Sequence, residues 1–142
     1  MALYLVVDIA GERVAIPSAS VESVVELEGL TPVPGAAAHI AGLSALRSRV
    51  LTVVDCRAAL ELPMAEGTRR EAIVATIGGH PYALLVDRVE DVMEGPDAPA
   101  PATTVLAAGW KRAARGTVEL GGDVLLTVDP AAFIEGPARE AA

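Results

Sequence analysis

The chain has 142 residues, a formal net charge of −8 and a sequence pI near 4.7. This acidic balance argues against sequence-independent binding to nucleic acid or to an anionic membrane surface, because both need clustered lysine and arginine. A single cysteine, Cys56, excludes an intrachain disulfide, and His39 and His80 are the only histidines, so metal ligands are scarce. The length predicts one domain.

The N-terminal segment does not have the pattern of a secretory leader. Asp8, Glu12 and Arg13 interrupt its hydrophobic residues early. No window of the chain approaches the roughly 20 apolar residues needed to cross a bilayer. We therefore expect a cytoplasmic protein.

The first half of the chain alternates short apolar segments with turn residues, which is typical of antiparallel strands. Gly11 supplies the positive φ of a hairpin turn, and Pro32 and Pro34 mark a loop because proline cannot donate to a strand ladder. Asp55 follows the last apolar segment and is placed to cap a short helix. The predicted strands are residues 3–9, 13–17, 21–27, 40–46 and 50–54.

A tight turn that carries two arginines, Arg47 and Arg49, separates the fourth and fifth predicted strands. Guanidinium groups held at a surface by two apolar strands can bind a carboxylate through two parallel hydrogen bonds. The alternative is a solvated hairpin tip, because exposed ion pairs contribute little. The turn is therefore a candidate recognition element.

The second half of the chain shows a similar succession of strands and turns. Its prolines make residues 95–104 a stiff loop, whereas residues 105–114 are ambiguous. Asp129 and Pro130 open a short helix over residues 130–134. The predicted strands are residues 71–77, 82–86, 87–93, 117–120 and 124–128.

An internal repeat relates the two halves. A shift of 68 residues aligns residues 9–26 with residues 77–94 without a gap, and the alignment continues to Arg47 over Arg115. After a six-residue insertion, the strand that ends at Asp55 falls on the last predicted strand. The repeat predicts two five-stranded units that close against each other, because each is too small to bury a core alone. Closed barrels are favoured, since closure removes unpaired edges, and partners commonly bind in the groove between two such units.

No catalytic constellation is found in the sequence. Cys56 follows a buried strand without a nearby base, so we expect a core thiol and not a nucleophile. His80 lies at a hairpin tip, and the paired glycines match no phosphate-binding fingerprint. Carboxylates alternate with valines on the half-polar strands, which favours a solvated face over an acid/base pair. Trp110 is expected to fill a barrel end or the junction.

Residues 42–63 resemble the signature of the CheW-like domain family. The segment reads Gly-Leu-Ser-Ala-Leu-Arg-Ser-Arg-Val-Leu-Thr-Val-Val-Asp-Cys-Arg and closes with Leu-Glu-Leu-Pro. Residues 31–35 and residues 85–92 also match the family pattern, and the resemblance covers residues 2–135. It implies an all-β, mainly antiparallel fold: two SH3-like five-stranded β-barrels packed side by side, with short helices.

The resemblance also implies the domain organisation. We expect a single CheW-like domain over residues 1–136, followed by a flexible tail over residues 137–142. The two barrels are expected at about residues 1–66 and 67–136, with strands that can exchange between them.

The family resemblance implies a non-catalytic adaptor without cofactors or metal. Such proteins link the cytoplasmic tips of methyl-accepting chemoreceptors to the regulatory domain of the histidine kinase CheA, in cytoplasmic arrays beside the membrane. Neither nucleic acid nor direct membrane insertion is expected. The receptor-binding groove implied by the resemblance consists of Arg47, Val21, Val24, Val86 and Val89. The implied kinase contacts are Ile40, Gly42 and Leu43.

Several residues depart from the family pattern. Ala45 replaces an asparagine, Ser48 a glycine and Thr52 a proline, and Ser23 stands where many members carry a glutamate that pairs with the motif arginine. Glu22 or Glu26 could take over that pair, but strand alternation places the neighbours of Ser23 on the opposite face. These departures keep a second function open: a regulator of this fold that binds only the kinase, as a competitor or insulator in a non-motility pathway. An enzymatic or small-molecule role in the groove is disfavoured, because no convergent polar groups are visible.

Overall fold

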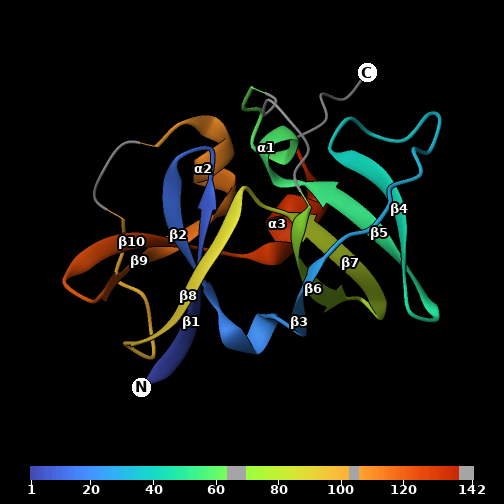
Figure 1. Ribbon diagram of the computed structural model, residues 1–142. Helices are drawn as coiled ribbons and strands as arrows, with labels where there is room; N and C mark the ends of the chain where they lie inside the picture. Colours follow the sequence, from blue (N-terminus) through green and yellow to red (C-terminus); the bar gives the residue numbers. More distant parts are fainter. Residues whose placement is uncertain (64–69, 103–105, 138–142) are drawn as a thin grey trace.

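The computed structural model describes residues 1–63, 70–102 and 106–137, so all of the expected tail except Pro137 lies outside the described residues (Figure 1). One group of strands consists of β1 (Ala2–Ile9), β2 (Glu12–Pro17), β8 (Arg88–Gly95), β9 (Ala114–Leu120) and β10 (Asp123–Val128). The other consists of β3 (Ser23–Glu26), β4 (Ile40–Leu46), β5 (Arg49–Asp55), β6 (Glu71–Ile77) and β7 (His80–Leu85). The helices are η1 (Ser18–Ser20), α1 (Cys56–Ala59), α2 (Ala108–Ala113) and α3 (Pro130–Glu135).

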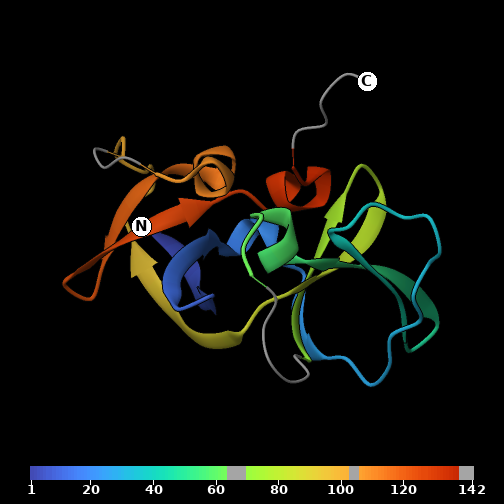
Figure 2. The same ribbon diagram turned by 90° about the horizontal axis from the view of Figure 1, so that it is seen from above.

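The strands form two five-stranded sheets. The first has the order β8-β1-β2-β10-β9 and contains the first two and the last three strands of the chain, so we call it the terminal barrel. The second has the order β3-β6-β7-β5-β4, and we call it the central barrel. Each half of the sequence therefore contributes strands to both sheets. The α-helices lie together on one side of the junction (Figure 2).

Each sheet closes on itself through a short bridge. In the central barrel, Thr31 exchanges two backbone hydrogen bonds of 2.8 Å with Leu43 of β4. In the terminal barrel, Ala100 makes the equivalent bonds with Thr117 of β9, at 2.9 and 2.7 Å. Closure satisfies backbone groups that an open edge would leave exposed. The structure confirms the predicted all-β, mainly antiparallel fold of two five-stranded barrels.

The internal repeat extends to strand order and register. Strands β1 to β5 correspond to β6 to β10. Replacing each strand of one sheet by its equivalent gives the strand order of the other sheet. In the parallel strand pairs, Thr127 lies opposite Ala15, and its equivalent Val53 lies opposite Ala83. The two barrels are therefore copies of one topology.

One detail of the sequence alignment is wrong. Arg47 and Ser48 form the turn between β4 and β5, so their equivalents are Gly121 and Gly122 between β9 and β10, and not the pair that begins at Arg115. The six-residue insertion lies before β9, in the longer connection that contains α2. The sequence between β8 and β9 has little similarity to its counterpart, so the position of the insertion was not visible there.

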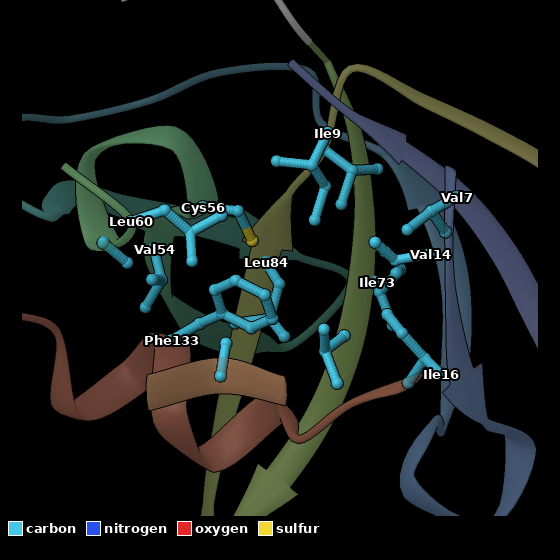
Figure 3. Packing of buried hydrophobic residues seen from close by; sticks show 14 of the residues in the cluster. Val7, Ile9, Val14, Ile16, Val54, Cys56, Leu60, Ile73, Leu84 and Phe133 are labelled. Carbon is cyan, nitrogen blue, oxygen red and sulfur yellow. The ribbon is translucent and has the colours of Figure 1, made fainter. Parts of the chain in front are cut away.

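The largest hydrophobic cluster lies between the barrels and not inside either of them. It joins Val14 and Ile16 of β2 to Ile73 of β6, all at most 1% exposed. Phe133 points from α3 toward Leu84 of β7 (Figure 3). Full burial of one such side chain contributes about 1.5–3 kcal/mol, so this cluster is the main attraction between the barrels.

Two equivalent aspartates start helices at the junction. The Asp55 carboxylate accepts the N–H groups of Arg57 and Ala58 at 2.9 and 3.4 Å, and Asp129 accepts that of Ala131 at 3.0 Å. Both act as N-caps, which satisfy donors at a helix start. The short helices therefore begin where the sequence predicted, and Cys56, 1% exposed, is buried as expected.

Helix α2 occupies the segment that was ambiguous in the sequence. Its Trp110 joins the junction cluster, as expected. Gly109 passes so close to α1 that a Cβ there would lie 2.1 Å from the carbonyl oxygen of Leu60. The Arg112 guanidinium donates to the carbonyl oxygen of Ala59 at 3.0 Å, which satisfies an acceptor at the end of α1.

Two equivalent glycines allow the barrels to close. Gly42 and Gly116 have φ values of 149° and 133°, a region that side chains disfavour. A Cβ would lie 2.3 Å from the carbonyl oxygen of Thr31 at Gly42, and equally close to that of Ala100 at Gly116. Both positions therefore require glycine.

We predict that Gly42→Ala and Gly116→Ala each lower the free energy of unfolding by about 2 kcal/mol or more, because the closing bridge must move away from a new Cβ. Urea unfolding followed by circular dichroism measures this loss. Gly29→Ala is the control, since a Cβ at Gly29 meets nothing within 4 Å. Unchanged stability of Gly42→Ala would refute the assignment.

Candidate functional site

Two crossings carry the chain between the barrels. The first crossing runs from β2 through η1 to β3, and the second joins β7 to β8 at Val86 and Asp87. The repeat makes the two crossings equivalent. The valines of the predicted receptor groove lie on or beside them: Val21 and Val24 at the first crossing, and Val86 and Val89 at the second.

These valines differ in accessibility. Val24 is 46% exposed, and Val21 and Val89 are partly buried against the junction cluster. Val86 is fully buried, so it cannot contact a partner directly and can only support the groove wall. The sequence could not show this, because Val86 follows a strand and is covered by the junction cluster, which takes side chains from both barrels.

An ion pair links the arginine turn to the first crossing. The Arg49 Nη1 atom lies 3.1 and 3.2 Å from the two carboxylate oxygens of Glu22. Both side chains are 45% exposed. The pair holds the β4–β5 turn beside the residues that flank Glu22, which are Ser23 and Val21, a residue of the predicted groove.

The identity of this pair differs from the family pattern. Glu22 pairs with Arg49 and not with the motif arginine Arg47, so it does not take over the usual pair. Glu22 directly precedes β3, which begins at Ser23. Arg47 has a φ of 57°, is exposed at the turn, and has no ion pair among the described residues.

The predicted kinase contacts lie along β4. Ile40 is partly buried against the junction cluster, Gly42 is buried, and Leu43 is 37% exposed. Gly42 therefore shapes the strand and offers no side chain to a partner. Next to Leu43, exposed Ala45 lies opposite Val50 of β5, which is 62% exposed.

Leu43, Ala45 and Val50 form an apolar patch on the outer face of the central barrel, and we call it the β4–β5 face. The sequence analysis missed Val50 because the residue belongs to a segment rich in β-branched residues, a pattern that predicts a buried strand. The equivalent pair on the terminal barrel is Val124 opposite Glu119, so the charge makes that surface more polar.

The second crossing is held by a partly buried ion pair that the sequence analysis did not identify. Arg57 of α1 donates from Nε to both carboxylate oxygens of Asp87, at 3.0 and 3.1 Å, and its Nη2 also binds Asp87. The hydrogen bond to Asp87 raises the pKa of Arg57, despite partial desolvation. Both residues belong to segments that match the family pattern, but sequence distance hides their contact.

The two barrels carry different charged residues at positions that the repeat makes equivalent. In the terminal barrel, Glu90 and Asp123 take the places of Glu22 and Arg49, and Arg13 lies between them at 3.0 and 3.3 Å. The hydrogen bond to Glu90 raises the pKa of Arg13. A cation on β2 thus replaces the one on β5.

Within residues 1–63, 70–102 and 106–137, no three His, Cys, Asp or Glu side chains are grouped to hold a metal ion. Among the helices of the same ranges, none has both the length and the apolar character needed to cross a membrane.

The chain matches the CheW-like domain family model over residues 3–138. It is 35% identical over 114 residues to a chemotaxis protein CheW of Rhizobium meliloti, which covers 79% of this chain and 74% of that protein. It is 30% identical over 128 residues to a probable chemotaxis protein CheW of Rhizobium etli, covering 87% and 83%.

The fold is also similar to the crystal structure of the scaffolding protein TtCheW from Thermoanaerobacter tengcongensis. The TM-score is 0.77 at 20% sequence identity, and the match covers 90% of this chain and 88% of the other. Fold, family match and relatives agree: the chain belongs to the CheW-like domain family, whose members are non-catalytic chemotaxis scaffold proteins.

Proposed function

We propose that this protein couples the cytoplasmic tips of methyl-accepting chemoreceptors to the regulatory domain of the histidine kinase CheA. The observation that carries the proposal is the Glu22–Arg49 ion pair, which holds the turn that carries Arg47 beside Val21. An adaptor needs two separate contact surfaces. The crossings with Arg47 supply one, and the β4–β5 face supplies the other.

The groove side suits an amphipathic helix such as those of a receptor tip. Exposed Val24 and the partly buried Val21 and Val89 provide apolar contacts, and Arg47 provides a cation at their border. Helices dock into grooves through apolar side chains on one face, with charged residues at the edge. A receptor-tip helix with a carboxylate at that edge would fit this arrangement.

The kinase side suits a partner with its own apolar patch. Exposed large hydrophobic residues that lie next to each other mark interaction surfaces more often than isolated ones do. We assign the kinase contact to the β4–β5 face, with Ile40 and Gly42 supporting Leu43 from within β4. Contacts of this size are modest singly, and repetition in an array multiplies their effect. Such an adaptor would work in the cytoplasm, beside the receptor arrays.

We predict that Arg47→Glu weakens binding of a receptor-tip fragment by about tenfold, because a charge-assisted contact is replaced by repulsion. Calorimetric titration measures the dissociation constant, which should be on the order of micromolar for the unmodified chain. Lys111→Glu, the same charge reversal on α2 of the terminal barrel, is the control and should bind normally. Equal weakening in both variants would show a general charge effect and contradict the assignment.

We predict that Val50→Glu weakens binding of the kinase regulatory domain by about tenfold, because a carboxylate would be desolvated in an apolar contact. Val124→Glu is the matched control, since Val124 is the equivalent residue of the terminal barrel and is 69% exposed. The same titration measures both variants. Kinase binding without any receptor binding by the unmodified chain would replace the adaptor with the kinase-only regulator.

A further inference from the structure

We propose that Asp87 is a positioning residue: with Arg57 it locks the second crossing to both barrels and leaves the first crossing as the compliant wall of the groove. For the groove this inference rests on the proposed function. The lock itself is a property of the chain alone, and the two parts can be tested separately.

The second crossing is bound from several directions. The backbone N–H of Asp87 donates to the carbonyl oxygen of Asp8 at 3.0 Å, and its carboxylate accepts the N–H of Ala10 at 2.8 Å. Asp8 and Ala10 belong to the end of β1 and the β1–β2 turn, so these two bonds fix the crossing to the terminal barrel.

Further bonds fix the same segment to the central barrel. The backbone N–H of Val86 donates to the carbonyl oxygen of Glu71 at 3.2 Å, and the N–H of Val89 donates to the Glu71 carboxylate at 2.5 Å. Arg57 adds α1, which follows β5 of the central barrel. Both partners of the ion pair are less than one-fifth exposed, at 19% and 18%, which strengthens the pair relative to a surface one.

The first crossing has no counterpart of this ion pair. The repeat places Ala19 at the position equivalent to Asp87, and Ala131 at the position equivalent to Arg57. Near Ala19 the structure leaves a cavity of about 490 Å³, whose walls include Pro17, Ser20 and Pro130.

The hydrogen bonds of the first crossing are also more local. The N–H of Val21 donates within the turn to the carbonyl oxygen of Ser18 at 3.0 Å, and that of Glu22 donates to Val74 of β6 at 2.7 Å. The hydrogen bonds of Val21 and Glu22 therefore tie the first crossing to the central barrel, whereas toward the terminal barrel η1 packs beside β1 with small side chains and borders the cavity. Segments with few buried contacts open at low free-energy cost.

This asymmetry gives the proposed groove one fixed and one adaptable wall. Val89 lies two residues from the lock at Asp87. Val21 follows η1, which can shift into the cavity beside it. In such a groove, the fixed wall sets the position of a bound helix and the adaptable wall adjusts the width. This suits a scaffold that binds helices with side chains of different sizes.

The direct test is amide hydrogen exchange of the whole chain, measured residue by residue with NMR, for the unmodified protein and Arg57→Gln. We expect exchange at Ala10 and Asp87 to accelerate by about tenfold or more in the variant, because a charge-assisted hydrogen-bond network is lost. Exchange at Glu22 should not change. Arg112→Gln, which removes a pair with Glu61 and a hydrogen bond to Ala59 of α1 but no contact of Asp87, is the matched control. Unchanged exchange at Ala10 and Asp87 in Arg57→Gln would overturn the lock.

A second variant adds the missing pair to the other crossing. Ala19→Asp combined with Ala131→Arg should slow exchange at Val21, and no slowing would contradict the idea that the absent pair leaves this crossing compliant. It also keeps the proposal testable if Arg57→Gln does not fold.

Titration with the receptor tip tests the part of the proposal that concerns the groove. Arg57→Gln should weaken receptor-tip binding by about fivefold and leave kinase-domain binding unchanged, since the β4–β5 face does not depend on the lock. Faster exchange with normal receptor binding would overturn the groove part alone. If the unmodified chain does not bind the receptor tip, the proposed function and the groove part both fail, whereas the exchange data still decide whether the lock exists.

Discussion

Burial of apolar side chains between the two barrels is the interaction on which the rest of the structure depends. The clusters inside the individual barrels are small and consist of residues such as Val53 and Ala83 on one side and Val6 and Ala15 on the other. The junction cluster is larger and takes side chains from both sheets and from all three α-helices. Neither barrel could bury those side chains alone, so the surfaces proposed for partners exist only in the assembled pair.

The repeat gives the two barrels nearly the same backbone, and the two barrels differ mainly in their side chains. Glu22 pairs with Arg49 of β5, whereas its equivalent Glu90 pairs with Arg13 of β2. Such exposed pairs contribute little to stability, but each fixes a turn against a strand start. Among the described residues, the partly buried pair of Arg57 with Asp87 has no copy in the other half of the repeat. The differences therefore concern orientation and surface chemistry more than folding.

Much of the fold could be predicted from the sequence because its signals are local. Strand positions follow from valine-rich segments, and the helix starts follow from Asp55 and Asp129. The contacts between distant segments could not be predicted in this way. The burial of Val86 depends on both barrels covering it, and the partner of Glu22 depends on where β3 begins. The exposure of Val50 follows from the position of β5 in the sheet, which the residue pattern does not encode.

The arrangement of the strands also constrains the order in which the protein can be built. The central barrel is continuous from β3 to β7, whereas the terminal barrel combines the first two strands with the last three. During synthesis, the ribosome completes the central barrel while β1 and β2 still lack β8, β9 and β10. The N-terminal hairpin therefore keeps an apolar face exposed until the last three strands emerge, and exposed apolar strands of this kind are prone to aggregate during folding.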